Sequence, residues 1–291
     1  MYASPIKTLI KSTLRALSLD IRRIEKTAAV PPVYQDVQET HTRLNCGQPA
    51  AYLCPIGKLC TFSGFSLGSK GWHPFVVAVN EYLHGRRQTY SGSILEKFYN
   101  SWQPADALEA LIAPIDGPAL LRQLPAYTAH QPWHLIHPKE RQAVMEKNIR
   151  DENHWAGQQH LDASSGYGLH GPVSPEKGEI EYARIVGVTD SIKRHGFDRS
   201  LADEDITVTA LERNGEYRFC IVHGQHRAAV LAALDYEHIP VSFRRLVSVS
   251  EAQHWPQVYR GVWSLAQAQA YIDHLFDFDA NDWARARGLT E

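Results

Sequence analysis

The sequence lacks long apolar runs and any recognisable export signal. None of its uninterrupted apolar stretches approaches the length of about 20 residues that a transmembrane helix needs. The N-terminal residues show neither the continuous apolar core nor the small-residue cleavage site of a signal peptide. These absences predict a cytoplasmic protein, and a peripheral location at the inner membrane is the alternative.

Net charge and cysteine spacing argue against two further classes of protein. The formal net charge is −2, so the chain lacks the basic field of most DNA-binding proteins, and we expect no specific DNA binding. Cys46, Cys54 and Cys60 are spaced too widely for the common zinc sites, and Cys220 stands far from them. We therefore expect free thiols and no metal site.

The most informative stretch comprises residues 206–245. It opens with apolar side chains that alternate with threonine, the period of a half-buried strand. Asn214-Gly215 is a strong hairpin signal, because both residues tolerate positive φ. Aromatic and β-branched side chains predict a second strand over residues 217–222. Gly224 then allows a sharp turn, and strong helix formers predict a helix over residues 225–234.

The chemistry of this stretch lies in the turn Gly224-Gln225-His226-Arg227. A glycine turn that opens a helix exposes backbone N–H groups and the positive end of the helix dipole, which suits a phosphate or another anion. Arg227 adds donors matched to phosphate oxygens, and His226 can donate a hydrogen bond or move a proton near neutral pH. The alternative interpretation is a structural turn with an exposed arginine.

Four features in a fixed order connect this stretch to a known family. The helix Val188–Phe197, with a Ser-Ile step before a glycine, precedes the turn at residues 224–227. An alanine-rich helix over residues 228–234 and the strand Ile239-Pro240-Val241 follow the turn. This order resembles the ParB/sulfiredoxin superfamily over residues 171–245. The resemblance implies an α+β fold with a small mixed sheet and a nucleotide site, here preceded by a mainly helical N-terminal region.

The turn also separates the branches of that superfamily. Sulfiredoxins carry a nucleophilic cysteine where Gln225 stands, so sulfiredoxin chemistry is excluded at this turn. The chromosome-partition branch continues into two further domains, and the segment after Arg245 is too short for them. The free-serine-kinase branch uses the turn without the cysteine, together with upstream carboxylates. It is the branch that this sequence resembles most, although His223 stands where that branch carries an aspartate.

This resemblance implies a nucleotide-dependent phosphotransferase that acts on a small hydroxyl compound or a glycan precursor. The nucleotide, which is ATP, ADP or CTP with Mg²⁺, would be bound by Gly224, Gln225, His226 and Arg227. His226 would also position the phosphoryl group. In the kinase branch catalytic carboxylates precede the turn, and the candidates here are Glu176, Glu179 and Glu181. The alternative is a non-catalytic nucleotide-binding module or scaffold, with cell-envelope polysaccharide synthesis as its context.

The rest of the chain divides into regions of different composition. Glycine and proline predict an irregular linker over residues 27–71, and aromatic residues at helical spacing predict packed helices over residues 72–150. Residues 151–178 are rich in glycine and histidine, and we predict a loop that frames the cleft, with His170 on the acceptor side. The full organisation is a basic helix at 1–26, the linker at 27–71, the helical region at 72–150, the nucleotide-binding domain at 151–250 and C-terminal helices at 251–291.

Residues 1–26 are predicted to form an amphipathic helix. Apolar residues recur at steps of three and four, and lysines and arginines occupy the other faces. We favour a helix that docks on the body of the protein. The alternative is a weak contact with an anionic membrane surface.

Overall fold

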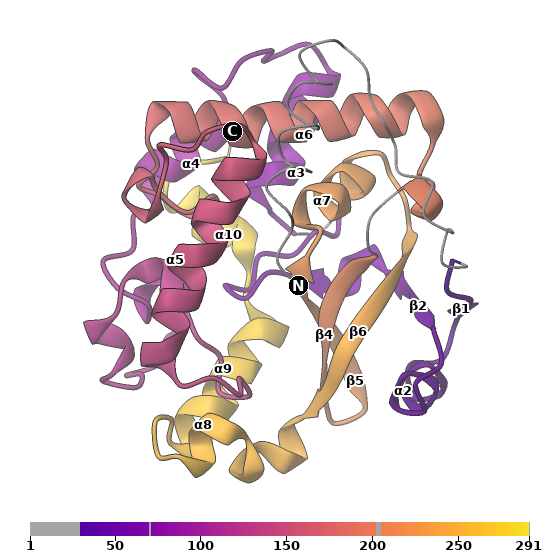
Figure 1. The fold of residues 1–291 in the computed structure, drawn as a ribbon, viewed down its shortest axis with the longest axis vertical. Helices are drawn as coiled ribbons and strands as arrows, with labels where there is room; N and C mark the ends of the chain where they lie inside the picture. Colours follow the sequence, from indigo (N-terminus) through magenta and orange to yellow (C-terminus); the bar gives the residue numbers. More distant parts are fainter. Residues whose placement is uncertain (1–29, 70, 202–204, 291) are drawn as a thin grey trace, which may run out of the picture.

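The computed structural model describes residues 30–69, 71–201 and 205–290 (Figure 1). The helix predicted over residues 1–26 lies outside these described residues. Within them the chain forms an α+β fold, in which helices surround one mixed sheet of six strands. The predicted class is therefore confirmed at the level of a mixed sheet with helices.

The sheet has the strand order β1-β2-β6-β4-β5-β3, so it combines distant parts of the chain. β4 and β5 form an antiparallel hairpin, and β6 joins β4 in parallel. β2 pairs with β6 in the antiparallel direction, whereas β1 and β3 pair in parallel with β2 and β5. The strands are β1 (Val33–Tyr34), β2 (Ala51–Pro55), β3 (Leu59–Cys60), β4 (Ile206–Arg213), β5 (Glu216–His223) and β6 (His238–Ser248).

Helices surround this sheet, and several of them have a capped first turn. They are α2 (Val37–Asn45), α3 (Pro74–Leu83), α4 (Ile94–Ser101), α5 (Pro138–Trp155), α6 (Pro175–His195), α7 (Gln225–Ala233), α8 (Pro256–Tyr259), α9 (Leu265–Asp277) and α10 (Ala280–Arg285). Short 3₁₀ turns are η1 (Ile56–Lys58), η2 (Glu109–Leu111), η3 (Leu121–Gln123), η4 (Ala126–Thr128), η5 (Ala163–Ser165), η6 (Arg199–Leu201) and η7 (Val249–His254). The Ser174 side chain caps α6, and Ser264 caps α9 in a capping box, which satisfies N–H groups that a helix leaves unpaired.

The predicted hairpin and the helix that follows it are confirmed. Asn214 and Gly215 connect β4 to β5 with φ angles of 54° and 83°, both positive as an Asn-Gly hairpin turn requires. Gly224 follows β5 directly, and α7 begins at the next residue. β4 is more buried than its alternation predicted, because its threonines Thr207 and Thr209 are covered as well as its apolar residues.

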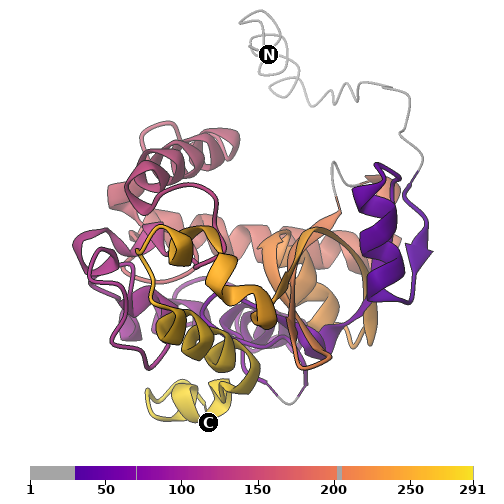
Figure 2. The same ribbon diagram turned by 90° about the horizontal axis from the view of Figure 1, so that it is seen from below.

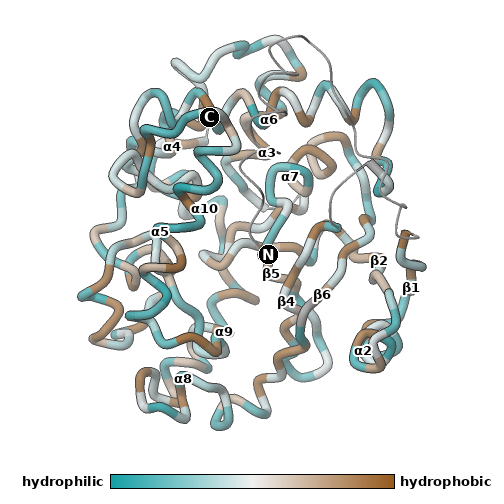
Figure 3. Tube along the Cα trace, viewed as in Figure 1, coloured by the Kyte–Doolittle hydropathy of each residue, from teal (hydrophilic) through white to brown (hydrophobic). Residues whose placement is uncertain are grey.

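Two hydrophobic cores explain why β4 is buried on both faces. The larger core packs Ile206 and Val208 of β4 against α3, α6 and α7. The smaller core joins Leu211 of β4 and Cys220 of β5 to α9. Figure 3 shows hydrophobic residues along β4 in the middle of the molecule. In Figure 1 the long α6 crosses above α7 and the strands.

The linker predicted over residues 27–71 was wrong from residue 30 onward. This segment contributes β1, α2, β2 and β3, and therefore half of the strands of the sheet. Its strands are short and pair with residues much later in the chain, so no local pattern revealed them. In both views α2 lies at the opposite side of the molecule from α5 (Figures 1 and 2).

The predicted helical region at 72–150 contains α3, α4 and most of α5, with three 3₁₀ turns between α4 and α5. Its aromatic residues form a core, as predicted: Trp72, Phe75, Phe98 and Trp102 are all buried. The ring of Phe65, from the preceding loop, packs against several of them. Among the described residues no helix is both long and apolar enough to cross a bilayer.

Candidate functional site

The turn before α7 has the geometry that the sequence predicted. Gly224 has φ 84° and ψ 25°, a left-handed conformation that glycine adopts without strain. A Cβ at this position would also lie 3.0 Å from Cγ1 of Ile206, so a side chain would crowd β4. Gly224 carries no side chain that could cap α7, and the first N–H bonded within the helix belongs to Ala228. The N–H groups of the first turn of α7 therefore have no partner within the helix.

One carboxylate of α6 reaches this turn, and it is buried. The side chain of Glu181 is only 2% exposed, and its Oε2 lies 3.0 Å from Nε2 of His226. Nε2 is itself buried, and its contact with Glu181 does not meet the geometric criteria of a hydrogen bond. The imidazole stacks on the ring of Phe75, with centroids 4.9 Å apart and planes 7° apart. Phe75 and Glu181 together fix the plane and the position of the His226 ring.

Two cations on the same face of α6 neutralise Glu181. Lys177 precedes it by one helical turn and places Nζ 2.8 Å from Oε1, although this lysine is only 1% exposed. Arg184 follows Glu181 and places Nη1 3.0 Å from the same oxygen. Burial alone would raise the pKa of Glu181, but His226, Lys177 and Arg184 outweigh burial and lower that pKa. Glu181 is therefore ionised across the physiological pH range.

Two residues of α5 hold these cations, and the loop after α5 covers Glu181. Asn153 accepts a hydrogen bond of 2.8 Å from Nζ of Lys177, and Glu152 lies 2.6 Å from Nη1 of Arg184. Gly168 lies directly on the Glu181 carboxylate, because a Cβ at Gly168 would come within 2.7 Å of Cδ. The predicted framing loop thus seals Glu181 from solvent, rather than only bordering a cleft.

Gln225 is held by a second buried histidine. The side-chain amide of Gln225 lies 3.1 Å from Nε2 of His73, and Nδ1 of His73 accepts the N–H of Phe75 at 3.1 Å. Burial lowers the pKa of His73 to about 3, so the ring is neutral. The neutral ring uses Nδ1 to accept from Phe75, and its Nε2 faces the amide nitrogen Nε2 of Gln225.

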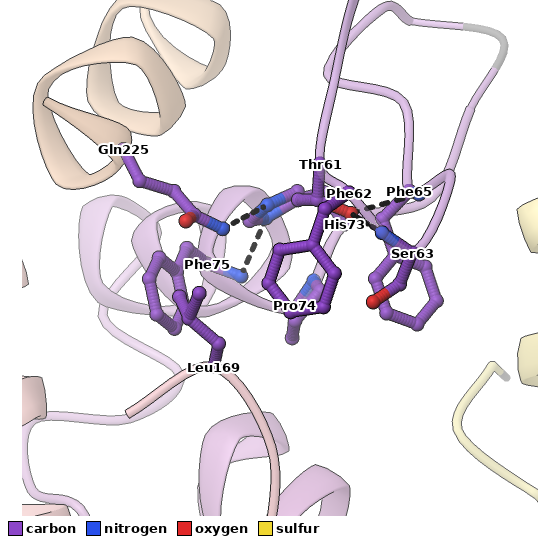
Figure 4. A pocket seen from close by; sticks show the side chains of 9 residues that line it. All are labelled: Thr61, Phe62, Ser63, Phe65, His73, Pro74, Phe75, Leu169 and Gln225. Carbon is purple, nitrogen blue, oxygen red and sulfur yellow. Dashed lines mark hydrogen bonds between the residues drawn. The ribbon is translucent and has the colours of Figure 1, made fainter. Parts of the chain in front are cut away.

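The enclosed space beside this contact is small. Figure 4 shows Gln225 and His73 pointing toward each other, with Phe75 and Leu169 beside them. Only about 10 Å³ is open to the centre of a water molecule, which is room for about one water. A nucleotide does not fit there.

Arg227 folds back over the turn that it follows. Its Nη2 lies 3.1 Å from the position that a Cβ of Gly224 would occupy. The residue is partly buried in the first turn of α7. Its guanidinium therefore lies close to the start of α7.

The other two predicted acidic residues do not contact the Gly224 turn. Glu176 is exposed and pairs with His160 at 2.9 Å, and Glu179 is exposed on another face of α6. The helical period separates them, since only one of the three carboxylates can share the buried face with Lys177. His170, predicted on the acceptor side, does not line the small cavity beside Gln225. It is buried, and its ring packs against Trp102 and Tyr167.

Sequence reasoning missed several groups that define this site. Phe75 and His73 lie at the start of α3, far from the turn in sequence, and no local signal links them to His226. Lys177 and Arg184 flank Glu181 at helical spacings of four and three, which are typical of exposed ion pairs. That spacing could have pointed to Glu181 among the three glutamates, but it could not have shown that the face is buried.

No three histidine, cysteine or acidic side chains gather as a metal site in the part of the chain that the structure describes. The residues near the turn also fit Mg²⁺ poorly, because His226 and two cations surround both oxygens of Glu181. No family model matches the sequence, and no curated protein matches it. The resemblance to the ParB/sulfiredoxin superfamily therefore rests on the four sequence features alone.

Proposed function

We propose that this protein binds a nucleotide at the Gly224 turn and transfers a phosphoryl group to a small hydroxyl compound or a glycan precursor. The observation that supports this proposal most is the contact between the ionised, buried Glu181 and His226 in the first turn of α7. Buried charged groups are uncommon outside sites that use them, and here they stand directly behind an anion-binding turn. The proposal extends the resemblance to the kinase branch of the superfamily.

The phosphates would be held by the start of α7. The N–H groups of the first turn, the positive end of the helix dipole and the guanidinium of Arg227 all favour an anion at one place. Gln225, whose amide nitrogen contacts His73, would border the same place.

The roles of the acidic and basic groups differ from those that the sequence predicted. Glu181 is a poor general base, because three partners lower its pKa and its carboxylate is sealed from solvent. We assign it the role of holding the His226 ring. His226 is about 23% exposed, and its Nδ1 makes no hydrogen bond to the described residues, so this nitrogen is the atom that would take the proton of the acceptor hydroxyl.

Mg²⁺ would come with the nucleotide rather than from a protein site. Its usual place is on the phosphate oxygens, where it offsets their charge with few carboxylate ligands from the protein. The chain's own contribution is then the orientation of the phosphates at the turn and the proton transfer at His226.

A non-catalytic binding module is the second candidate, and one observation favours it. Each oxygen of Glu181 already has a cationic or histidine partner, as expected for a charge network that only stabilises the structure. In that case His226 would contact phosphate without any chemistry.

Calorimetry with ATP, ADP and CTP, each with Mg²⁺, tests the binding step on the full chain. Arg227→Ala should weaken nucleotide binding by about 1.5–3 kcal/mol, the range of a hydrogen bond to a charged group. Arg122→Ala is the matched control, since Arg122 is exposed and distant from the turn in sequence, and its affinity should equal that of the wild type. Equal affinity in all three proteins would remove the phosphate role of Arg227.

Phosphate transfer to candidate hydroxyl acceptors then separates the enzyme from the binding module. Glu181→Gln and His226→Asn should each lower turnover by a factor of about 10² or more, the scale of lost acid–base catalysis, while nucleotide affinity changes little. Glu179→Gln should behave like the wild type, because this residue is exposed and away from the turn. A wild type that binds nucleotide without transfer to any acceptor would leave the module as the better account.

A further inference from the structure

A larger cleft lies near the opposite end of β5 from the Gly224 turn. One wall is the loop formed by Gly57, residues 66–69 and Gly71, and the other is the junction of α9 and α10 at residues 276–281. Its volume is about 440 Å³, within the range of small-molecule sites. Arg218 lines this cleft and precedes Gly224 along β5 by roughly 20 Å of extended chain. The cleft is therefore separate from the proposed nucleotide site.

Glycines shape the loop wall of this cleft. A Cβ on Gly68 would lie 2.8 Å from Cα of Gly57, and a Cβ on Gly71 would lie 2.9 Å from the backbone oxygen of Ser66. Only glycine allows the backbone to approach itself so closely at both places. Among the described residues, the wall consequently offers backbone groups and the small hydroxyl side chains of Ser66 and Ser69.

Arg218 joins the two walls and supplies hydrogen-bond donors. Its Nη2 donates to the backbone oxygen of Phe276 at 2.9 Å, and its Nη1 donates to that of Gly57 at 3.4 Å. No carboxylate within the described residues lies at ion-pair distance from Arg218. The guanidinium has further N–H groups beyond these two, and they remain available to a ligand.

The opposite wall supplies acceptors. Asp279 uses its Oδ1 to accept the N–H groups of Asn281 and Asp282 at the start of α10, which leaves Oδ2 for another partner. Asp277 forms a two-pronged ion pair with Arg213, so its charge is offset while its oxygens keep accepting capacity. Among the described residues the cleft therefore has donors at one side and acceptors at the other.

We propose that this cleft binds a neutral, hydroxyl-rich ligand, namely a mono- or disaccharide. A sugar hydroxyl both donates and accepts hydrogen bonds, so it can satisfy Arg218 and Asp279 at once. A phosphate only accepts and would face two carboxylates, whereas an amine cation only donates and would face Arg218. The apolar parts of Phe278 and Ala280 also border the space and would contact the ring carbons of a sugar.

Ligand-detected saturation-transfer NMR on the full chain tests this proposal at millimolar ligand concentration. The probes are D-glucose, D-galactose, D-mannose, N-acetyl-D-glucosamine and maltose, with inorganic phosphate as a competitor. At least one sugar should give a saturable signal that phosphate does not displace. Ser69→Trp, which places a bulky side chain at the cleft, should abolish the signal, and Ser91→Trp at an exposed site outside the cleft should not.

A gentler variant keeps the test independent of folding. Asp279→Asn retains an N-cap for α10, since asparagine caps as well as aspartate, but it removes the charged acceptor. It should weaken sugar binding about tenfold, which corresponds to about 1.4 kcal/mol. Absence of any sugar signal, a signal that survives Ser69→Trp, or displacement by phosphate would each overturn the proposal. None of these outcomes depends on nucleotide binding or turnover.

Discussion

The charged side chains near the two ends of β5 differ in burial. Near Gly224, the ionised Glu181 and Lys177 are almost completely buried, and each contacts partners at 2.8–3.0 Å. Near Arg218, the carboxylates stand at the surface, and the side chain of Asp277 is 62% exposed even while it pairs with Arg213. A buried charge is tolerated only when it is paired, so the first arrangement fixes one geometry. Near Arg218, a ligand can displace the water around the exposed carboxylates.

The largest loss of stability is expected when a buried ion-pair partner of Glu181 is removed. Lys177→Met keeps the volume of the side chain but leaves Glu181 with one fewer cation and Asn153 without its donor. We expect the free energy of unfolding to fall by about 3–5 kcal/mol, the usual effect of breaking a buried ion pair. Urea denaturation followed by circular dichroism measures it.

The control for this variant is Lys147→Met. Lys147 pairs with Asp151 on the outside of α5, where its side chain is 72% exposed, so its removal should leave the unfolding midpoint almost unchanged. A similar fall in the free energy of unfolding in the two variants would mean that the burial of Lys177 does not contribute to stability.

Acid should weaken the protein through buried histidines. Burial lowers the pKa of His73 and His130 to about 3 and that of His134 to about 2, from an ordinary value of 6.5. Below pH 6.5 these histidines bind protons in the unfolded chain but stay neutral in the folded chain. The free energy of unfolding therefore falls as pH falls from 6.5 toward 3. Each histidine should contribute a slope of up to about 1.4 kcal/mol per pH unit in that window.

The variant His73→Asn tests how much His73 alone contributes to this pH dependence. Asparagine can cap α3 in place of His73 but does not titrate. The slope of unfolding free energy against pH between 6 and 5 should therefore become shallower by about 1 kcal/mol per pH unit. An unchanged slope would show that His73 does not titrate on unfolding as its burial requires.

The smallest effect is expected at the Arg218 end. Arg218→Gln removes hydrogen bonds to Gly57 and Phe276 from a partly exposed position, and glutamine can replace one of them. The free energy of unfolding should fall by about 1 kcal/mol, well below the loss in Lys177→Met. A loss as large as that of Lys177→Met would mean that the cleft is as rigid as the buried network.

Local signals in the sequence sufficed for the part of the fold around β5. Asn214-Gly215, Gly224 and the run of small helix formers each specify backbone conformation within a few residues, and the structure has the hairpin, the turn and α7 where they were predicted. The strands of residues 33–60 could not be predicted in the same way. Their register depends on partners in β5 and β6, and their own prolines and glycines suggested a linker.

The candidate site shows the same limit. The sequence pointed to the turn and to three glutamates, but it could not choose among them, because the choice depends on which face of α6 packs against α3 and α7. Glu181 lies on that face, and Glu176 and Glu179 do not. The contacts of Phe75 and His73 are tertiary and have no counterpart in local sequence.

The pairing of β2 with β6 and of β3 with β5 has a consequence for how the chain is made. Both strands leave the ribosome long before their partners: β3 cannot pair with β5 until residues near 220 have been synthesised, and β2 cannot pair with β6 until residues near 241 have been synthesised. A fragment that starts at residue 151 would present β5 and β6 with unpaired outer edges, which promote association between chains. Expression of that fragment should therefore yield aggregates, and co-expression with residues 30–150 should rescue it.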